Sequence, residues 1–434
     1  MTSSFGSCIF QFSLLPLLLL FFIFSFPNAQ SSSPTPSPTP RPTSIVFETE
    51  YDSLTLQFMI KINQGTPLAP VKLVLDLGGK LPWLRCDKGY TSSSYKPVKC
   101  TSPKCAQASK PVTCVLCNNS TEPHKTWCHN NACSIHTRNP VTKAIGHGEL
   151  ITDFVTGRSN PGFSEAPAPL LTPRRIAFGC ATSGEFSLRG LAKGAQGVAG
   201  LGRSSVLSLI SQFSAGFRLS RIFALELGTG KIFFGGGPYV YTFGSDFIDL
   251  RESHLWSDTP LLTNPKSSEE YFIDVKSIKI YNVTVPNIDK RLLSINKVTG
   301  TGGTKIDFQA PYTILQTSIY KAVAKVHMAR YKNATMVPPV APFSTCYKAS
   351  TMDVPEWILE GNRIPHSIVF VFPKGGMSTV SDLKWMGEDV RCLSFIDGGL
   401  YPKTSIVIGR YNFNGFLEFD ISRSRFGFLQ PLFP

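Results

Sequence analysis

The chain has 434 residues, of which 42% are apolar, 12% aromatic and 17% charged. This composition is too apolar and too aromatic for a mainly disordered protein. The 35 Gly and 33 Pro residues favour a turn-rich β structure. The sequence has no heptad run, no collagen repeat and only one long apolar segment, so a coiled coil, a solenoid and a polytopic membrane protein are excluded.

The chain is basic, with 43 Lys and Arg against 29 Asp and Glu and a formal charge of +14. A basic protein can bind nucleic acid, an acidic polysaccharide or an acidic protein. The basic residues are scattered, and no nucleic-acid-binding signature is present, so we expect no nucleic-acid partner.

The N-terminus is predicted to be a secretory signal peptide over residues 1–29, because residues 9–26 are almost all apolar and Ala29 offers a small residue for cleavage. The alternative is an uncleaved anchor, which Pro16 disfavours. We expect contact with a membrane only through this segment, and a secreted, extracellular or cell-wall location. Residues 30–43 are rich in Ser, Thr and Pro and predict an extended linker.

Ten cysteines follow the signal peptide, an even number that predicts disulfide bonds in an oxidising compartment. Seven of them fall between residues 86 and 133, and the spacing around His124 and His129 leaves a zinc knuckle as an alternative. The ten are Cys86, Cys100, Cys105, Cys114, Cys117, Cys128, Cys133, Cys180, Cys346 and Cys392.

Four glycosylation sequons fit a secreted protein and predict surface loops where they are used. They lie at Asn118, Asn119, Asn282 and Asn333.

From Ser44 onward the chain alternates short apolar segments with turn residues, which predicts a mostly β fold. Strands are expected over residues 54–62, 71–75, 222–227, 231–234 and 271–280. The best helical stretches are residues 205–213 and 318–328.

A weak internal duplication decides the architecture. In the first half a strand ends in Asp76, and residues 197–202 follow as an apolar stretch running into Gly. In the second half residues 303–307 end in Asp307, and residues 406–409 again run into Gly. Two such halves would bring Asp76 and Asp307 together.

These segments resemble the pepsin-type aspartic protease family, and more narrowly the plant group of extracellular dermal glycoproteins, basic 7S globulins and xylanase inhibitors. The matching stretches run through nearly the whole mature chain and include residues 64–68, 74–79, 302–306 and 405–409 together with the cysteine cluster. The resemblance implies a bilobal fold with a cleft between two β lobes, over residues 44–220 and 221–434.

Aspartic proteolysis needs two carboxylates that share one proton. The resemblance makes Asp76 and Asp307 the candidate catalytic pair, but their motifs are degenerate. Leu77 lacks the orienting hydroxyl of the active family, and residues 307–309 lack both the hydroxyl and the glycine, which is expected to hinder the tight turn there. The flap tyrosine is also missing, because no Tyr occurs between residues 139 and 148.

The resemblance also implies a different activity, since relatives block microbial glycoside hydrolases such as endoglucanases and xylanases. A cationic side chain on a rigid loop would enter the acidic cleft of the enzyme. The inhibitory loops map to residues 397–403, with Lys403, and to residues 330–333, with Arg330 and Lys332.

We therefore expect a secreted, catalytically weak or inactive homologue that inhibits a cell-wall-degrading glycoside hydrolase. The alternatives are an active aspartic endopeptidase acting on a peptide substrate, and a cell-wall or storage binding protein of the basic 7S globulin type. No cofactor and no metal site are expected.

Overall fold

The structure is a computed structural model that describes residues 42–117, 128–164, 168–181, 187–243, 246–280, 283–353, 368–373, 377–380, 382–413 and 415–429. The predicted signal peptide and most of the predicted linker lie outside the described residues. The same holds for the sequons at Asn118, Asn119 and Asn282, and for His124. Among the helices described, none is long and apolar enough to span a membrane.

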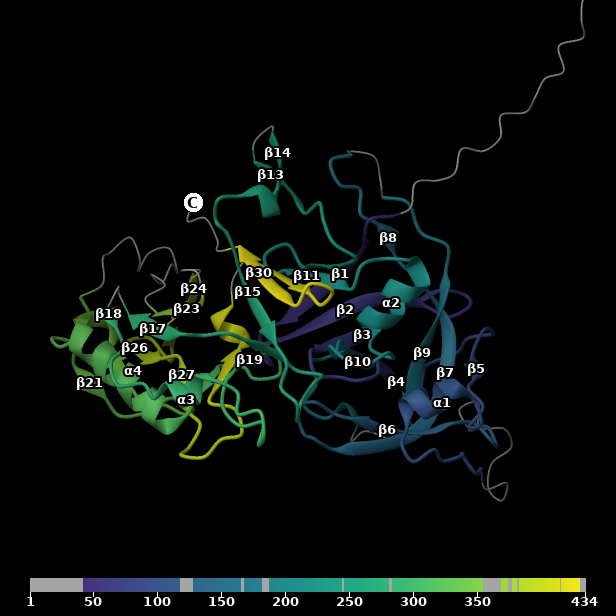
Figure 1. Cartoon of the computed structure of the whole chain (residues 1–434), viewed down its shortest axis with the longest axis horizontal. Coiled ribbons are helices and arrows are strands. Elements are labelled where there is room, and N and C mark those ends of the chain that lie inside the picture. The colour runs from purple at the N-terminus through teal and green to yellow at the C-terminus, as the bar shows by residue number, and fades with distance from the viewer. Residues whose placement is uncertain are drawn as a thin grey trace, which may run out of the picture. The chain divides into compact units, whose positions relative to one another are not determined.

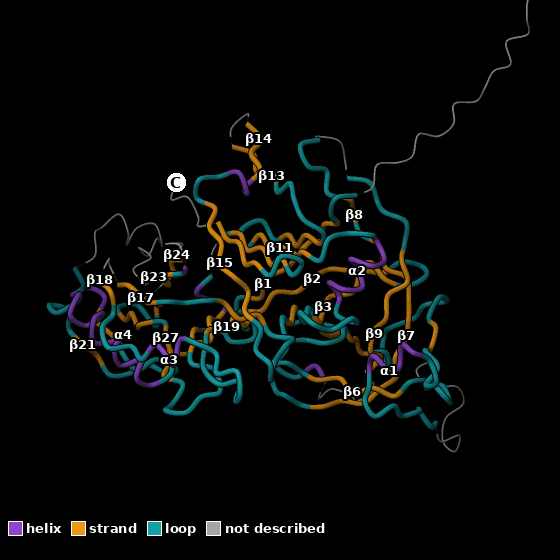
Figure 2. The backbone as a smooth tube through the Cα atoms, in the orientation of Figure 1, coloured by secondary structure: helices purple, strands orange, loops and turns teal. Residues whose placement is uncertain are grey.

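Strands and loops make up most of the chain, and the helices are few and short (Figure 2). The predicted mostly β fold class is therefore confirmed. The first half forms a sheet from β1 (Ile45–Asp52), β2 (Gln57–Gln64), β3 (Ala69–Asp76), β4 (Trp83–Arg85), β5 (Lys96–Pro97), β6 (Ser134–Arg138), β7 (Ile145–Thr156), β9 (Arg174–Ala181) and β10 (Gly197–Gly200). Two helices accompany it, α1 (Pro103–Ala108) and α2 (Leu209–Phe217).

A second sheet joins strands from both ends of the chain. Its order is β8 (Arg158–Ser159), β1, β12 (Lys231–Phe234), β11 (Ile222–Glu226), β29 (Phe416–Asp420), β30 (Arg425–Leu429) and β15 (Trp256–Leu262). Figure 1 shows the early strand β1 and the yellow C-terminal strand β30 in the same region, and β12, β11 and β29 lie between them in the sheet. The predicted boundary between residues 220 and 221 falls just before β11, inside this shared sheet, and stays a prediction.

The second half builds its own sheets. One contains β15, β16 (Tyr271–Ile273), β19 (Thr304–Asp307), β28 (Ile406–Gly409), β20 (Thr313–Leu315) and β27 (Phe395–Asp397). One smaller sheet has the order β18 (Val283–Thr284), β17 (Ser277–Ile280), β23 (Ile368–Val371) and β24 (Met377–Val380). Another has the order β21 (Met336–Val337), β22 (Cys346–Lys348), β26 (Val390–Leu393) and β25 (Leu383–Trp385). A separate hairpin pairs β13 (Val240–Phe243) with β14 (Asp246–Asp249). The helical segments are α3 (Lys290–Leu293), α4 (Thr317–Arg330), η2 (Leu250–Glu252), η3 (Ala349–Thr351) and η5 (Arg410–Asn412).

The internal duplication is visible in the strand pairing. β3 runs parallel to β10, with Asp76 opposite Gly200. β19 runs parallel to β28 in the same way, with Asp307 opposite Gly409. A Cβ on Gly200 or Gly409 would lie 2.7 or 2.3 Å from backbone atoms of the loop that follows Asp76 or Asp307, so each glycine lets that loop pass close to β10 or β28.

Three predicted elements have clearly different limits in the structure. The strand expected from residue 54 begins at Gln57, because Asp52 Oδ1 accepts the Leu54 and Thr55 N–H groups and forms a turn there. The helix expected over residues 205–213 runs from Leu209 to Phe217, since Ser208 is still extended, with φ −62° and ψ 152°. The segment 271–280 forms two strands, β16 and β17, rather than one.

All ten cysteines after the signal segment form disulfide bonds. The pairs are Cys86–Cys180, Cys100–Cys114, Cys105–Cys133, Cys117–Cys128 and Cys346–Cys392. The zinc-knuckle alternative loses its thiolate ligands to this pairing, because a disulfide sulfur is not a thiolate.

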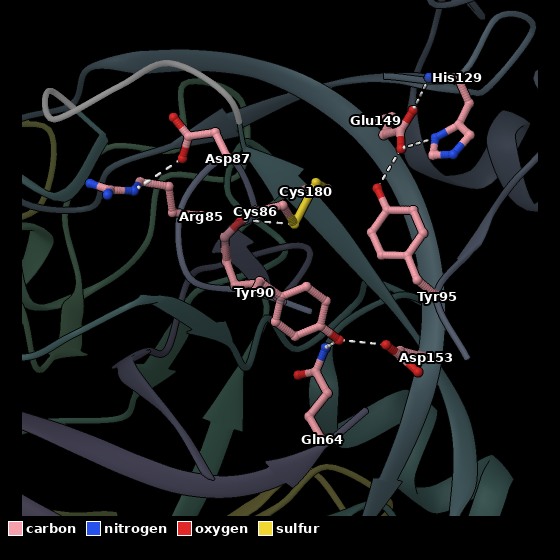
Figure 3. The surroundings of a disulfide bond; sticks show 11 residues. Gln64, Arg85, Cys86, Asp87, Tyr90, Tyr95, His129, Glu149, Asp153 and Cys180 are labelled. Atoms are coloured by element: carbon pink, nitrogen blue, oxygen red, sulfur yellow. Dashed lines mark hydrogen bonds and ion pairs between the residues drawn. A yellow bond between two sulfur atoms is a disulfide. The ribbon is translucent and has the colours of Figure 1, made fainter. Parts of the chain in front are cut away.

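Two buried carboxylates on β7 are satisfied by hydrogen-bond donors near the first disulfide (Figure 3). Glu149 accepts from the Tyr95 hydroxyl, and lies 2.8 Å from His129 Nδ1. Asp153 accepts from the Tyr90 hydroxyl, which itself accepts from Gln64 at 2.8 Å. These carboxylates stabilise the sheet and offer no free group for chemistry.

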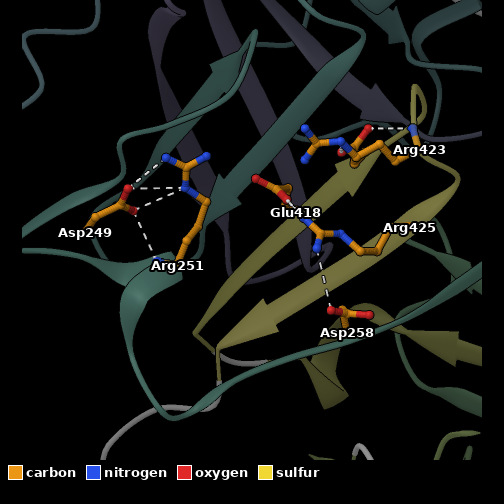
Figure 4. Close-up of polar contacts among 7 residues, drawn as sticks. Asp249, Arg251, Asp258, Glu418, Arg423 and Arg425 are labelled. Carbon is orange, nitrogen blue, oxygen red and sulfur yellow. Dashed lines mark hydrogen bonds and ion pairs between the residues drawn. The ribbon is translucent and has the colours of Figure 1, made fainter. Parts of the chain in front are cut away.

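The shared sheet carries a second set of charged pairs (Figure 4). The Arg425 guanidinium nitrogens lie 3.6 Å from a carboxylate oxygen of buried Glu418 and 3.6 Å from one of exposed Asp258. Arg425 thereby links β30 to β29 and to β15. Arg251 makes a 2.7 Å ion pair with Asp249 at the end of β14. The Arg425 contacts link the C-terminal hairpin to β15, whereas the Arg251 pair is local to the segment after β14.

Candidate active-site cleft and inhibitory loop

A cavity of about 660 Å³ lies between residues of both halves. Asp76 and Asp307 both line it, so the duplicated strands place the two candidate catalytic side chains in one cleft. The side chains of Glu270, Lys305 and Gln309 line the same cavity.

Each candidate carboxylate is oriented by the backbone two residues further on. The Gly78 N–H donates to Asp76 Oδ1 at 3.0 Å, and the Gln309 N–H donates to Asp307 Oδ1 at 2.9 Å. The prediction that Gln309 would hinder this turn is therefore wrong. Neither Gly78 nor Gln309 has a positive φ, so a residue with a side chain can take this conformation.

The positions of the missing hydroxyls are filled by core side chains. Leu77 and Phe308 are each only 2% exposed, and the Phe308 ring packs against Phe58 and Phe413 at centroid distances of 6.2 Å. The Gln309 side-chain amide donates instead to the Leu75 carbonyl, which links the two halves beside the cleft. The cleft floor thus keeps its backbone but loses two hydroxyl donors.

A lysine lies among the cleft carboxylates. Lys305 Nζ is 3.2 Å from Asp307 Oδ2 and 2.7 Å from Glu270 Oε1, and its side chain is only 16% exposed. Residues two apart in a strand share a face, so Lys305 and Asp307 point to the same side of β19. Asp307 is therefore held as part of an ion pair.

The electrostatic environment of the cleft raises the pKa values of Asp76 and Lys305. Burial and the neighbouring Asp307 raise the pKa of Asp76 to about 6, although the Gly78 N–H, Lys143 and Lys305 oppose this shift. Burial lowers the pKa of Lys305, but its pairing with Asp307 and Glu270 outweighs burial and raises the pKa overall. Lys305 therefore stays cationic and occupies an oxygen of Asp307 that a catalytic water would otherwise contact.

The hairpin formed by β6 and β7 takes the place of the protease flap. Its turn covers residues 139–144 and places Pro140 and Lys143 at the cavity. The Trp83 indole N–H donates to the Arg138 carbonyl at 3.2 Å and fixes the base of the hairpin. The described flap thus presents a lysine at its tip and no tyrosine.

The loop over residues 397–403 is anchored yet exposed. Three of its carbonyls accept hydrogen bonds. The Gly399 carbonyl accepts from the Thr317 N–H at 3.0 Å, and the Leu400 carbonyl accepts from the Gln316 side chain at 3.0 Å. The Lys403 carbonyl accepts from the Gly302 N–H at 2.9 Å. The side chains at its tip point outward, since Leu400 is 61% and Tyr401 96% exposed. Lys403 is also exposed and lines one side of the cavity.

The second predicted inhibitory segment lies at the end of α4. Arg330 and Lys332 are exposed, and the Arg330 guanidinium lies 5.5 Å from the centre of the Tyr331 ring. Asn333 is exposed and so is accessible to a glycan. These residues do not line the cavity that Lys403 reaches.

Within the described ranges no group of three or more His, Cys, Asp or Glu is arranged to hold a metal ion. Four residues of the site were not singled out from the sequence: Glu270, Lys305, Gln309 in its bridging role, and Lys143. For Lys305 a signal existed, because strand alternation places it beside Asp307. Glu270 and Lys143 come from distant loops, which no local pattern reveals.

Comparison with known proteins identifies the family. Sequence models described as xylanase inhibitor N-terminal and xylanase inhibitor C-terminal match residues 58–236 and 270–430. A Nicotiana benthamiana protein named "Probable aspartic proteinase GIP2" is 41% identical over 403 residues, covering 88% of this chain and 87% of that protein. The chain belongs to the xylanase-inhibitor-like family of pepsin-like proteins.

Other members of the family agree with this assignment. Gamma conglutin 1 of Prunus dulcis is 36% identical over 399 residues, covering 89% of this chain and 86% of that protein. The crystal structure of edgp matches with a TM-score of 0.75 and 35% identity over 90% of this chain and 96% of that one. The structure of an aspartic proteinase from Irpex lacteus matches with a TM-score of 0.52 and 15% identity over 90% of this chain and 98% of that one. This match supports the bilobal pepsin-like fold alone.

Proposed function

We propose that this protein is a secreted inhibitor of microbial cell-wall-degrading glycoside hydrolases, either endoglucanases or xylanases. The observation that carries the proposal is the loop at residues 397–403. Its backbone is fixed by three carbonyl hydrogen bonds, while Leu400 and Tyr401 stay 61% and 96% exposed beside Lys403. A preorganised loop with an exposed aromatic side chain and a cation has the character of a binding hot spot.

The chemistry of the target fits this loop. A glycosidase cleft holds two carboxylates at the scissile bond, and its sugar subsites offer surfaces against which an aromatic ring can pack. The Lys403 ammonium would pair with a cleft carboxylate, and Tyr401 would fill the neighbouring subsite. The formal charge of +14 favours approach to an acidic cleft.

Secretion is part of the proposal. Five disulfides are stable in an oxidising compartment, and such bonds are rare in reducing ones. The apolar N-terminal stretch supplies the signal that secretion needs. N-terminal sequencing of protein secreted by plant cells should begin near Gln30, whereas retention of residues 1–29 would contradict cleavage.

The test is inhibition of a purified endoglucanase and a purified xylanase by the wild-type protein and by Lys403→Ala. Loss of one well-placed charged contact should raise the inhibition constant about tenfold or more. Lys321→Ala, an exposed lysine on α4, is the matched control and should change the constant less than about twofold. No inhibition of either enzyme class, or equal effects of the two substitutions, would refute the proposal.

An aspartic endopeptidase is the second candidate, because Asp76 and Asp307 face one cavity and both keep their orienting N–H contact. Because the pKa of Asp76 is raised to about 6, this carboxyl is protonated at acidic pH, as one member of a working pair must be. Cleavage of an unfolded protein at acidic pH, abolished by pepstatin and by Asp76→Asn, would support this candidate. Activity no higher than that of Asp76→Asn would remove it.

A further inference from the structure

The rim of the cleft is cationic. Five exposed basic residues line it, three from the first half and two from the second: Lys80, Arg138, Lys143, Lys266 and Lys403. In the part of the chain that the structure describes, none of the five takes part in an ion pair. Unpaired cations facing one cavity create a positive potential that attracts anions.

The acidic groups of the cleft are already engaged and do not cancel this rim. Lys305 forms ion pairs with Glu270 and Asp307 at 2.7 and 3.2 Å and so balances one of their two negative charges. Glu269 accepts the Ser204 and Ser205 N–H groups at 3.2 and 2.9 Å. Asp76 has a pKa raised to about 6, so it loses charge in mildly acidic surroundings. A bound anion would therefore meet five cations that are in no described ion pair, although Lys143 also donates to the Pro140 carbonyl, and fewer carboxylates than cations.

The turn of the flap hairpin has most of its backbone N–H groups already hydrogen-bonded within the turn. Asn139 Oδ1 accepts the Val141 and Thr142 N–H groups at 2.8 and 3.0 Å, and the Asn139 carbonyl accepts the Lys143 N–H at 3.0 Å. The Ala144 N–H points to the Thr142 hydroxyl at 3.4 Å. An extended peptide binds such a cleft through main-chain hydrogen bonds to a strand edge, and these donors are already used.

Aromatic platforms are also lacking. The aromatic side chains lining the cavity are Trp83, only 4% exposed, and the ring of His136. A neutral sugar chain binds largely by stacking on exposed aromatic faces, so it has little to hold it here. What the cleft offers is a set of spaced cations that can each take one carboxylate.

We propose that this cleft binds an acidic oligosaccharide, a chain of uronic acids whose repeated carboxylates pair with the rim cations. The chain lies along the cavity across both halves. This binding site is separate from the exposed tip of the loop at residues 397–403, with Lys403 at the border of the two surfaces. The inference goes beyond glycosidase inhibition and does not depend on it.

The experiment measures binding of an oligogalacturonate to the full mature protein by titration calorimetry. The cleft variant carries Lys80→Gln, Arg138→Gln and Lys143→Gln, which spares Lys403 and Tyr401. Each exposed charge pair contributes about a twofold to fivefold change in affinity, so the triple variant should bind about tenfold more weakly or worse. Raising the salt concentration should weaken binding by wild type and have less effect on the triple variant.

The matched control removes three exposed lysines that do not line the cleft, by Lys231→Gln, Lys321→Gln and Lys325→Gln. It has the same net charge as the cleft variant and should bind within about twofold of wild type. The fully methyl-esterified oligomer, which lacks the charges, should not bind. Melting temperatures of both variants check that each is folded.

Three results would overturn the proposal. They are no binding of the oligogalacturonate by wild type, equal loss in the cleft and control variants, or polyaspartate bound as tightly as the sugar chain. The last result would mean that an acidic peptide is the better ligand. Glycosidase inhibition by the cleft variant should equal that of the control variant, which has the same net charge, so this site and the proposed inhibitory loop can fail independently.

Discussion

Lys305 is the residue that most clearly separates this cleft from a working protease pair. Its ammonium lies within 3.2 Å of Asp307 and 2.7 Å of Glu270, so one half of the pair is bound as a salt bridge. The backbone around Asp76 and Asp307 is otherwise nearly symmetric, with matching N–H contacts of 3.0 and 2.9 Å. The difference between the two halves is therefore one of charge rather than of backbone geometry.

Replacing Lys305 by Met should destabilise the protein by about 2 kcal/mol, because it leaves two partly buried carboxylates without their cation. Lys276→Met is the matched control. Lys276 pairs with Asp274 at 2.8 Å but is 57% exposed, so its loss should cost less than about 0.5 kcal/mol. Urea denaturation at neutral pH measures both. Equal effects would mean that Lys305 does not stabilise the cleft.

Asp76→Asn should change the pH dependence of stability. A carboxyl whose pKa rises from 3.8 to about 6 on folding binds more protons in the folded state, so wild type loses stability as the pH rises from 4 to 6. The side-chain oxygen of the introduced asparagine can still accept the Gly78 N–H. We compare the free energy of unfolding of the variant with that of wild type at each pH. The difference in favour of the variant should be about 2 kcal/mol larger at pH 7 than at pH 4. A difference that does not change with pH would contradict the raised pKa.

The loop at residues 397–403 owes its rigidity to contacts with β20 and α4. Asp397 Oδ1 accepts the Thr317 hydroxyl at 2.6 Å and the Gly399 N–H at 3.0 Å. Gly398 also donates to the Leu315 carbonyl at 2.8 Å, and a Cβ there would meet Ile314 at 2.6 Å. The loop thus presents its tip on a fixed base.

Asp397→Ala should weaken glycosidase inhibition about tenfold although neither Tyr401 nor Lys403 is changed, because a loosened loop must be ordered on binding. The measurement is the inhibition constant, with the melting temperature as a check on folding. Asp289→Ala, which removes an exposed N-cap of α3, is the control and should leave inhibition unchanged. Unaltered inhibition by Asp397→Ala would show that rigidity is unimportant.

Much of this arrangement could be predicted from the sequence, and the reasons differ by element. The strands ending in Asp76 and Asp307 and the Gly-terminated strands beside them follow from apolar runs and from the duplication. The predicted start of α2 is wrong because a run of serines favours turns as well as helix caps. The Lys305 ion pairs and the anchoring of residues 397–403 depend on loops far apart in the chain, so no local pattern indicates them.

The whole molecule combines a cleft floor that contains ion-paired carboxylates with a basic exterior. Its formal charge is +14, and five of its cations surround one cavity. The two halves are held by a shared sheet that contains β1, β11 and β29, so the surfaces of both halves are presented on one frame. The positive charge of such a molecule attracts acidic surfaces over long distances.

Association with an acidic glycosidase should consequently depend on salt. We expect the association rate constant to fall at least about tenfold between low salt and about 1 M salt, with a smaller change in the dissociation rate. Surface plasmon resonance over a salt series measures both constants. A salt effect confined to the dissociation rate would indicate that overall charge does not steer the encounter.

The central claim is that the loop at residues 397–403, and not the aspartate pair, carries the activity. The most direct measurement compares two double variants as inhibitors of one glycosidase. The loop variant carries Tyr401→Ala and Lys403→Ala, and the aspartate variant carries Asp76→Asn and Asp307→Asn. The account predicts that the loop variant raises the inhibition constant about a hundredfold, as two tenfold contacts would, and that the aspartate variant inhibits like wild type. The account would be contradicted if the aspartate variant no longer inhibited the glycosidase while the loop variant inhibited it like wild type.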